Sequence, residues 1–516
     1  MATAASEFAQ ARLERRAMSE PFYITTAIAY PNGRPHIGHA YEAIAADVIA
    51  RFQRAQGRDV RLVTGTDEHG LKMVQTARGQ GRDTLEFADE MSGYFRQMCD
   101  ELSISYDAFV RTTEDRHHQA SIALWKAMEA NGDLYLDRYE GWYSVRDEAF
   151  YDEKELIEGE GGVKLSPQNT PVEWTVEESW FFRLSRYAEP LLKLYADNPD
   201  FIRPESRRNE IVRFVEGGLK DLSVSRTSFD WGVPVPGSPG HVMYVWVDAL
   251  TTYMTGVGFP DDRASYDRFW PADLHLIGKD IVRFHAVYWP AFLMSARLPL
   301  PKSLFGHGFL LARGEKMSKS LGNVVDPMEL ARTYGVDSLR YFLMREVSFG
   351  QDGSYSDEAI VTRCNAELAN SFGNLAQRTF SMIVKNLDGV VPAAGEAPDD
   401  AALLARVAEA AAEAKSRFGD YDFSVGLDAW MAAVFAANAY VDAQAPWALR
   451  KTDPDRMAQV LGTLAAAVEQ LAVVVEPVVP NAIARLQAYV EEGRAAGRLA
   501  APTPIFPRLE LVDTPE

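Results

Sequence analysis

The feature that most constrains the fold is an apolar segment followed by a turn-rich loop and a helical pattern. Residues 22–29 (FYITTAIA) are apolar and rich in strand-favouring residues, so they predict a buried strand. After the loop YPNGRPHIG, Ile44, Val48 and Phe52 recur every four residues, which indicates a helix. Residues 59–64 (DVRLVT) predict a second strand. This order is typical of the βαβ unit of a nucleotide-binding parallel sheet.

Three further regions follow this unit. Residues 115–235 are irregular and rich in acidic and aromatic side chains, which indicates an insertion that interrupts the sheet. The apolar segments 241–250 (HVMYVWVDAL) and 273–280 (DLHLIGKD) predict two more buried strands. From about residue 358 to 497 the pattern is helical. Because 516 residues exceed one core, we predict an α/β protein whose parallel sheet is split by an insertion and followed by a helical domain.

The N-terminus and the cysteines bear on the compartment. Residues 1–18 carry scattered charge and no apolar core, so they predict a disordered extension rather than a secretory signal. No apolar run looks long enough to span a bilayer. The two cysteines, Cys99 and Cys364, lie far apart in sequence, which argues against a disulfide framework. We therefore expect a cytoplasmic protein.

The overall charge limits the ways in which the chain can bind nucleic acid. A formal net charge of −20 argues against non-specific binding through the field of the whole protein. A local basic face is still compatible with it, because charges act over a screening length of about 8–10 Å.

The first motif with a chemical interpretation is His36-Ile37-Gly38-His39, placed where the loop enters the helix. Backbone N–H groups at a helix start attract phosphate, and two imidazoles three residues apart can donate to one triphosphate. Gly38 has no side chain, so a flat base can approach the backbone. The alternative is a pair of histidines that cap a helix and bind no ligand.

The second motif is Lys316-Met317-Ser318-Lys319-Ser320, which lies between Gly314 and Gly322. Two lysines on a glycine-bounded loop are suited to following a pyrophosphate as it leaves, because lysine is a flexible point charge. The alternative is a solvated surface loop.

The two motifs in this order resemble the signature pair of class I aminoacyl-tRNA synthetases. From about residue 21 onward, many segments are similar to the methionyl-tRNA synthetase family rather than to the leucine, isoleucine or valine enzymes. They are AIAYPNGRPHIGHAYEAIAADVIARF, TGTDEHGLK, GWYSVRDEAFY, VWVDALTTY, GKDIVRFHAVYWPAFL, HGFLLARGEKMSKSLGN, NLAQR, QAPW and IFPRLE. The insertion also looks too short for the editing domain that isoleucine and valine enzymes need, because one methylene is worth only about 1–3 kcal/mol.

The resemblance implies a methionine–tRNA ligase that forms methionyl-adenylate from ATP and L-methionine and transfers methionine to initiator and elongator tRNA. It implies catalytic roles for His36, His39, Lys316 and Lys319. It implies ATP contacts for Gly38, Gly278, Lys279, Met317 and Ser318. The residues at the family's methionine-binding positions are Ile28, Tyr30, Asp67, Trp246, Ala249, Tyr253, Ile281 and His285. Asp67 matches the carboxylate that holds the substrate ammonium, and the aromatic residues suit a polarisable thioether.

The aromatic members of this pocket have an alternative role, because most Trp and Tyr side chains simply pack in a core. Trp246 in particular lies in a segment that reads as a buried strand, where it would be purely structural.

Three residues of the helical region match family positions that read the anticodon. Asn374 and Arg378 are four apart on one predicted helix face, and Trp447 matches a residue on which a base stacks. The alternative for Trp447 is a core residue at a helix end after Pro446.

The insertion departs from relatives whose cysteine pairs bind zinc in a knuckle, because it offers Ser144 and Asp147 and no cysteine. We expect Mg²⁺ with ATP, no structural zinc, no membrane partner, and a bacterial-type monomer without a C-terminal tRNA-binding extension. The expected divisions begin with a disordered extension at 1–18. The two halves of a Rossmann catalytic domain follow at 19–115 and 238–305, on either side of a connective insertion at 116–237. A region at 306–357 holds the lysine motif and contacts the tRNA stem, and an α-helical anticodon-binding domain occupies 358–516.

Two other functions compete with this interpretation. A nucleotidylyltransferase uses a similar His-x-x-His loop, but such proteins are usually shorter and lack a helical domain of this kind. A catalytically inactive tRNA-binding relative would usually have lost signature residues, and both motifs are intact here.

Overall fold

A computed structural model describes residues 19–146, 149–312 and 324–512. These residues form two compact units, which are described in turn. Of the described residues, the first unit comprises 19–35, 53–100, 104–146 and 149–307, and the second unit comprises 36–52, 101–103, 308–312 and 324–512.

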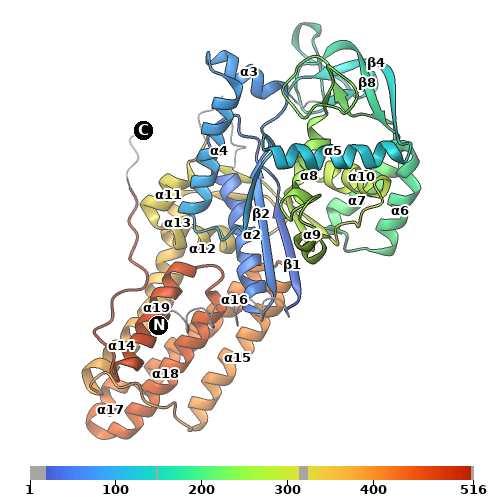
Figure 1. Ribbon diagram of the computed structural model, residues 1–516. Coiled ribbons are helices and arrows are strands. Elements are labelled where there is room, and N and C mark those ends of the chain that lie inside the picture. Colours follow the sequence, from blue (N-terminus) through green and yellow to red (C-terminus); the bar gives the residue numbers. More distant parts are fainter. Residues whose placement is uncertain (1–18, 147–148, 313–323, 513–516) are drawn as a thin grey trace, which may run out of the picture. The chain divides into compact units, whose positions relative to one another are not determined.

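The first unit is built on a six-stranded sheet in the order β3-β2-β1-β13-β14-β9, in which every neighbouring pair is parallel. The strands are β1 (Pro21–Thr26), β2 (Asp59–Thr66), β3 (Ala108–Arg111), β9 (Ile202–Arg203), β13 (Leu274–Gly278) and β14 (Leu304–His307). Nearly every residue of β1, β2 and β13 is buried, as expected for parallel strands covered on both faces. Figure 1 shows β1 and β2 side by side.

Helix α2 (Ile37–Ala55) connects β1 to the parallel strand β2, so the predicted strand–loop–helix–strand order is confirmed. Its apolar residues Ile44, Val48 and Phe52 are buried, as their spacing predicts. The helix ends just before Gly57, whose φ of 84° is accessible to glycine at little cost.

Among the described residues, eight α-helices belong wholly or mainly to the first unit: α3 (Leu71–Gly79), α4 (Thr84–Glu101), α5 (Asp115–Ala130), α6 (Ala188–Asp197), α7 (Glu205–Glu216), α8 (Val245–Thr255), α9 (Arg263–Phe269) and α10 (Trp289–Ser295). One large apolar core joins the sheet to α5, α8 and α10 through residues such as Trp125, Leu250 and Trp289. A smaller cluster of Met73, Phe87 and neighbouring residues lies under α3 and α4.

The strand predicted at 241–250 is wrong. Only Val242–Met243 is extended (β12), and the chain then enters α8. All but one of the eleven residues of α8 are buried, so the helix is covered on every side and its apolar residues lack the one-sided period that distinguishes a helix. The strand predicted at 273–280 is confirmed as β13.

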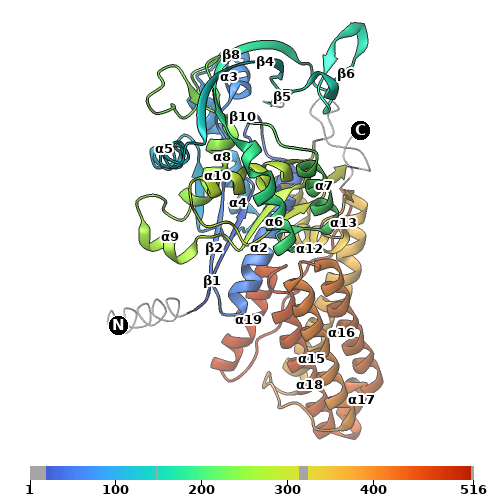
Figure 2. The ribbon, with the colours of Figure 1, turned by 90° about the vertical axis from the view of Figure 1, so that its right-hand side faces the viewer.

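The insertion is more regular than its sequence indicates. After α5 it forms an antiparallel sheet in the order β10-β8-β4-β5, with β4 (Leu134–Ser144) and β8 (Glu173–Phe182) as its long members. Figure 2 shows β4 and β8 as a long curved ribbon. The shorter strands of this region are β5 (Ala149–Tyr151), β6 (Ile157–Glu158), β7 (Lys164–Leu165), β10 (Leu222–Ser223) and β11 (Ser225–Arg226). Strand β9, which follows α6, belongs to the main parallel sheet.

The second unit is mainly helical beyond residue 326. Its elements after α2 are β15 (Leu310–Ala312), α11 (Pro327–Tyr334), α12 (Val336–Glu346), β16 (Gly353–Tyr355), α13 (Asp357–Cys364), α14 (Asn374–Asn386), α15 (Pro398–Gly419), α16 (Phe423–Gln444), α17 (Pro446–Thr452), α18 (Pro454–Val475) and α19 (Pro480–Ala495). The predicted stripe from Ile360 to Leu375 is buried, which confirms its helical period. Helices α15, α16 and α18 pack against one another (Figure 1).

Helix α18 corrects one expectation from sequence. It is 22 residues long and contains an apolar 18-residue window with a mean hydropathy of 1.7, so by length and composition it could cross a membrane. However, 61% of the apolar window is buried inside the protein. The Trp430 indole of α16 lies against it and donates to Leu471 O at 2.9 Å. The composition is therefore that of the central helix of a bundle.

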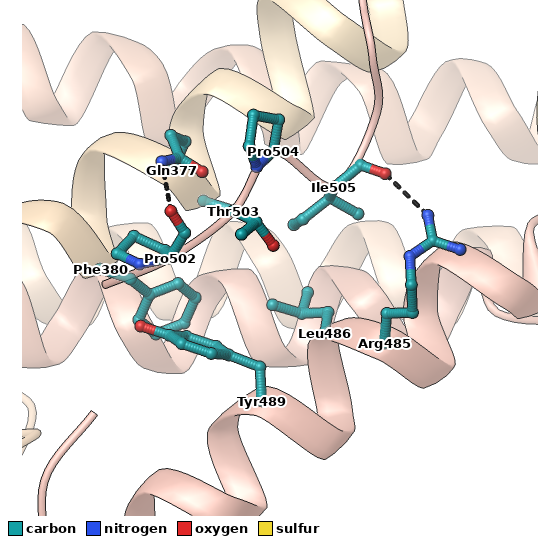
Figure 3. A pocket seen from close by; sticks show the side chains of 10 residues that line it. Gln377, Phe380, Arg485, Leu486, Tyr489, Pro502, Thr503, Pro504 and Ile505 are labelled. Carbon is teal, nitrogen blue, oxygen red and sulfur yellow. Dashed lines mark hydrogen bonds between the residues drawn. The ribbon is translucent and has the colours of Figure 1, made fainter. Parts of the chain in front are cut away.

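The C-terminal segment lies over α14 and α19 and encloses a small pocket (Figure 3). Side chains hold its main-chain carbonyl groups: Gln377 donates to Pro502 O at 3.0 Å and Arg485 to Ile505 O at 3.0 Å. The cavity volume is about 40 Å³, which is too small for an amino acid or a nucleotide. This pocket is therefore a packing feature rather than a substrate site.

Candidate active site

His36 and His39 lie at the start of α2 with their imidazole centroids 3.8 Å apart. Each Nδ1 accepts a backbone N–H: Gly38 N donates to His36 Nδ1 at 3.1 Å, and His36 N donates to His39 Nδ1 at 3.1 Å. A neutral imidazole that accepts at Nδ1 carries its proton on Nε2. The local fold therefore makes both Nε2 groups donors, which is the state needed to bind phosphate oxygens at a helix start.

The chain that follows the second motif returns to the first one. Ile37 N donates to Val325 O at 3.0 Å, so the segment just after Asn323 is joined to the His-Ile-Gly-His motif by a main-chain hydrogen bond. Residues 313–323, which include Lys316, Met317, Ser318 and Lys319, lie outside the described residues.

The predicted methionine-binding residues of the first unit follow the carboxyl ends of three adjacent parallel strands. Ile28 and Tyr30 come after β1, Asp67 follows β2, and Ile281 follows β13. Gly278 and Lys279, predicted to contact ATP, lie at the end of β13. Ligands of open α/β sheets bind outside the carboxyl ends of the strands, so this edge is where a substrate site belongs.

The remaining pocket residues come from α8 and from the helical segment after β13. Trp246, Ala249 and Tyr253 lie on α8, and the Tyr253 hydroxyl donates to His285 Nε2 at 2.6 Å. His285 Nδ1 in turn donates to Ile281 O at 2.9 Å. Three of the eight predicted methionine-binding residues, Tyr253, His285 and Ile281, are thus joined by hydrogen bonds. Trp246 and Ala249 lie in the segment predicted as a strand, which is helical from Val245 onward.

Burial lowers the pKa of His285 to about 4, although its hydrogen bond with Ile281 opposes the shift. The ring is therefore neutral near pH 7, in agreement with the acceptor role of Nε2 toward Tyr253. Burial likewise holds the pKa of nearby His275 well below its usual value. Uncharged imidazoles among these residues are compatible with the predicted binding of an apolar thioether side chain.

Phe284 is a pocket neighbour that the sequence prediction missed. Its ring stacks on Trp246 with a centroid distance of 3.9 Å and an interplanar angle of 4°. Phe284 immediately precedes His285 in the segment GKDIVRFHAVYWPAFL, and this position beside a predicted binding residue could have identified it. However, an aromatic residue in an apolar run is usually part of the core. Here it fixes the orientation of the Trp246 indole.

Two of the three predicted anticodon residues meet in the second unit. The Arg378 guanidinium lies 5.8 Å from the centre of the Trp447 ring, although the two residues are far apart in sequence. Trp447 is 52% exposed, so it is not the core residue that its position after Pro446 allows. Arg378 also lies 3.7 Å from the Asp442 carboxylate. Asn374, at the start of α14, is exposed. An exposed indole beside a guanidinium is suited to an unstacked base.

Comparison with known proteins decides the family. Residues 22–380 match the model "tRNA synthetases class I (M)", and residues 391–499 match the "Anticodon binding domain of methionyl tRNA ligase". The methionine–tRNA ligase of Brucella suis is 57% identical over 96% of this chain and 99% of its own length. The chain belongs to the methionyl-tRNA synthetases.

Other relatives of this family agree at the level of structure. The methionyl-tRNA synthetase of Mycobacterium tuberculosis in complex with methionyl-adenylate has a TM-score of 0.91 and 54% identity over 95% of this chain and 100% of that chain. The methionine–tRNA ligase of Mycobacterium bovis is 54% identical over 96% of this chain and 99% of its own length. The Rossmann-type catalytic fold, the helical anticodon-binding domain and the ligase activity toward methionine and tRNA are therefore confirmed.

The knuckle region of this synthetase contains a buried cluster of hydroxyl groups. Thr170 Oγ1 lies 2.6 Å from Ser144 Oγ and 2.7 Å from Ser166 Oγ, and all three residues are at most 1% exposed. Asp147 lies outside the described residues. Over the ranges that the structure describes, no three His, Cys, Asp or Glu side chains are grouped to hold a metal ion. Hydroxyl groups are poor zinc ligands, so this cluster is compatible with a zinc-free knuckle, which stays a prediction.

Gly38 provides a direct test of the histidine arrangement. A Cβ at this position would lie 2.9 Å from His36 Cε1, so the imidazole must move in a Gly38→Ala variant. We expect the rate of methionine-dependent ATP–pyrophosphate exchange to fall about tenfold, because small misplacements of a catalytic group are costly, while the KM for methionine stays unchanged. Gly79→Ala is the control, because a Cβ there meets nothing within 4 Å. Equal rates for the two variants would contradict the role given to His36.

Proposed function

We propose that this methionine–tRNA ligase binds methionine at the carboxyl edge of β1, β2 and β13. The Asp67 carboxylate accepts the substrate ammonium, and the thioether lies against Trp246, Ala249 and Tyr253 of α8. The observation that carries the proposal is that Asp67 and Ile281 follow strands of one parallel sheet at the edge where ligands bind, and that Tyr253 of α8 is joined to Ile281 through His285. Ile28, Tyr30, Ile281 and His285 complete the pocket.

In the first step, a methionine carboxylate oxygen attacks the α-phosphorus of ATP. A new O–P bond forms as the bond from the α-phosphorus to the bridging oxygen breaks, and pyrophosphate leaves with both electrons. No protein nucleophile takes part, so positioning and charge stabilisation lower the barrier. Mg²⁺ enters with ATP and offsets phosphate charge.

Each proposed ATP residue has one task in that step. His36 and His39 donate from Nε2 to phosphate oxygens, a role supported by the backbone bonds to both Nδ1 atoms. Lys316 and Lys319 stabilise the developing charge of pyrophosphate, which no protein group protonates. The backbone positions proposed to border the nucleotide are Gly38, Gly278, Lys279, Met317 and Ser318.

In the second step, a hydroxyl of the terminal tRNA ribose attacks the methionyl carbonyl and AMP leaves. We propose that Asn374, Arg378 and Trp447 select the tRNA, both initiator and elongator, by contacts with unstacked anticodon bases. Local contacts are required because the protein is strongly acidic as a whole. Cytoplasmic action is a further proposal, supported by two buried cysteines in their free form.

The experiment that tests these separate roles measures methionine activation and tRNA charging in a Trp447→Ala variant. Loss of a stacked base is worth about 1–3 kcal/mol, so kcat/KM for tRNA charging should fall about 5- to 150-fold. Methionine-dependent ATP–pyrophosphate exchange should be unaffected. Phe435→Ala, at an aromatic residue of α16 that is 56% exposed, is the matched control. Normal charging by Trp447→Ala would remove this residue from the tRNA interface.

A further inference from the structure

A buried chain of three titratable side chains lies next to the proposed methionine site. Asp248 of α8 accepts a hydrogen bond from His69 Nδ1 at 2.5 Å on one carboxylate oxygen and from His117 Nε2 at 2.6 Å on the other. The side chains are 0% exposed for Asp248 and His117 and 4% exposed for His69. They come from α8, from the loop after β2 and from α5. None of the three has a task in the two reaction steps.

Helix α8 presents different residues on its two sides. At roughly 100° per residue, Trp246, Ala249 and Tyr253 share one side, and Asp248 and Thr255 lie roughly opposite. The second side is the one fixed by α5, because His117 lies 2.6 Å from Asp248 and its Nδ1 lies 3.0 Å from Thr255 Oγ1. One imidazole therefore holds two turns of the helix, and the opposite side faces the proposed pocket.

The other end of the chain holds the loop that carries Asp67. His69 is two residues beyond Asp67, whose backbone N donates to Ala29 O at 2.8 Å. The intervening Glu68 receives Nε and Nη2 of Arg111 at 2.7 and 2.9 Å. The Trp231 indole donates to Glu68 O at 2.7 Å and meets the His69 ring edge to face. The loop is thus fixed on both sides of the proposed ammonium ligand.

The energetics favour a positioning role over a stabilising one. Burial by itself raises the pKa of the Asp248 carboxyl, but the charge and hydrogen bonds of the two histidines hold it below its usual value. The carboxylate is therefore charged in a place where an apolar side chain of similar volume is often equally stabilising. What an apolar replacement cannot reproduce is the pair of directional bonds that fix a loop and two helices to one another.

We propose that the His69–Asp248–His117 chain is a positioning network that sets the separation between the Asp67 carboxylate and the pocket side of α8. Methionine is bound at both ends, by its ammonium and by its flexible thioether side chain, so affinity depends on that separation. The proposal rests on the proposed methionine site. It assigns no contact with substrate to the three residues of the network.

The first test is Asp248→Asn, which keeps the shape of the side chain and turns an amide N–H toward one imidazole. We expect the KM for methionine in ATP–pyrophosphate exchange to rise about tenfold or more, since small displacements are costly. The KM for ATP should change less than twofold, because the side chains that bond to Asp248, His69 and His117, are not among the residues proposed to bind ATP. When Asp67→Asn is already present, Asp248→Asn should raise the KM for methionine by a smaller factor. The reason is that the contact between residue 67 and the substrate ammonium, which Asp248→Asn is expected to displace, is already weakened.

Two variants of His69 test the same positioning role if Asp248→Asn fails to fold. His69→Asn can place an amide N–H at the position of Nδ1, whereas His69→Leu removes the donor. We expect His69→Asn to have a near-wild-type KM for methionine and His69→Leu to resemble Asp248→Asn. Equal KM values for the two His69 variants would overturn the proposal.

The matched control is Asp133→Asn, at a second buried carboxylate of the first unit. Asp133 accepts bonds from Asn131, Tyr187 and Ser295 and is 2% exposed. The Asp133→Asn substitution should lower the melting temperature and leave the KM for methionine unchanged. If Asp248→Asn behaves in the same way, the network is merely structural and the proposal fails. If Asp67→Asn also leaves that KM unchanged, the proposed methionine site itself is wrong.

Discussion

Replacing Asp67 by asparagine is expected to raise the KM for methionine about 30-fold to several thousand-fold. This increase corresponds to a loss of about 2–5 kcal/mol in binding free energy. Asparagine keeps the shape of the side chain and removes the charge that would pair with the substrate ammonium. An unpaired ammonium in a partly desolvated site loses more than the bond itself. Steady-state ATP–pyrophosphate exchange over a wide methionine range measures the effect.

The specificity of that loss matters as much as its size. The KM for ATP should remain within about twofold, because the carboxylate is assigned to the amino acid alone. Asp262→Asn provides the control, since this exposed carboxylate of the same unit only caps α9 by accepting from Ser265 N at 3.1 Å. A KM for methionine within threefold of wild type in Asp67→Asn would show that another group binds the ammonium.

The second large effect is expected at the histidine pair. In His36→Asn and His39→Asn the amide oxygen can still accept the backbone N–H that each Nδ1 accepts, but the Nε2 donor is lost. We expect kcat for exchange to fall about 10²–10³-fold in each variant, the usual loss when one preorganised donor to developing charge is removed.

Affinity and rescue separate this role from simple misfolding. Methionine binding, measured by calorimetry without ATP, should change less than twofold. His39→Gln, which can present an amide N–H near the position of Nε2, should recover part of the rate lost in His39→Asn. Full exchange activity in both asparagine variants would assign phosphate binding to other groups.

The sequence pattern was sufficient to predict two kinds of element: buried strands, which appear as short apolar runs, and helices that bury one side. The order of β1, loop, α2 and β2 follows from alternating apolar and turn-forming segments, and the buried stripe from Ile360 to Leu375 follows from a helical period. The segment at 241–250 failed because α8 is buried on all sides, so its apolar residues show no period. The candidate site residues were found from local motifs that match the family, and their roles stay predictions.

Interactions between distant segments could not be predicted in the same way. His117 and His69 reach Asp248 across 131 and 179 residues, and no spacing rule joins such positions. The bond from Ile37 N to Val325 O, which joins the first motif to the chain that follows the second, uses backbone atoms that carry no sequence signal. Trp447 shows the same limit, because only the fold reveals that Arg378 lies beside it and that its ring is exposed.

The most direct measurement of the central claim is ATP–pyrophosphate exchange by the wild-type protein with each of the twenty amino acids in turn. If one apolar pocket selects methionine, methionine should support ATP–pyrophosphate exchange. Leucine, isoleucine and valine should give only the background rate that is measured without an amino acid. Exchange with another amino acid at a comparable rate, or none with methionine, would contradict the account of the site.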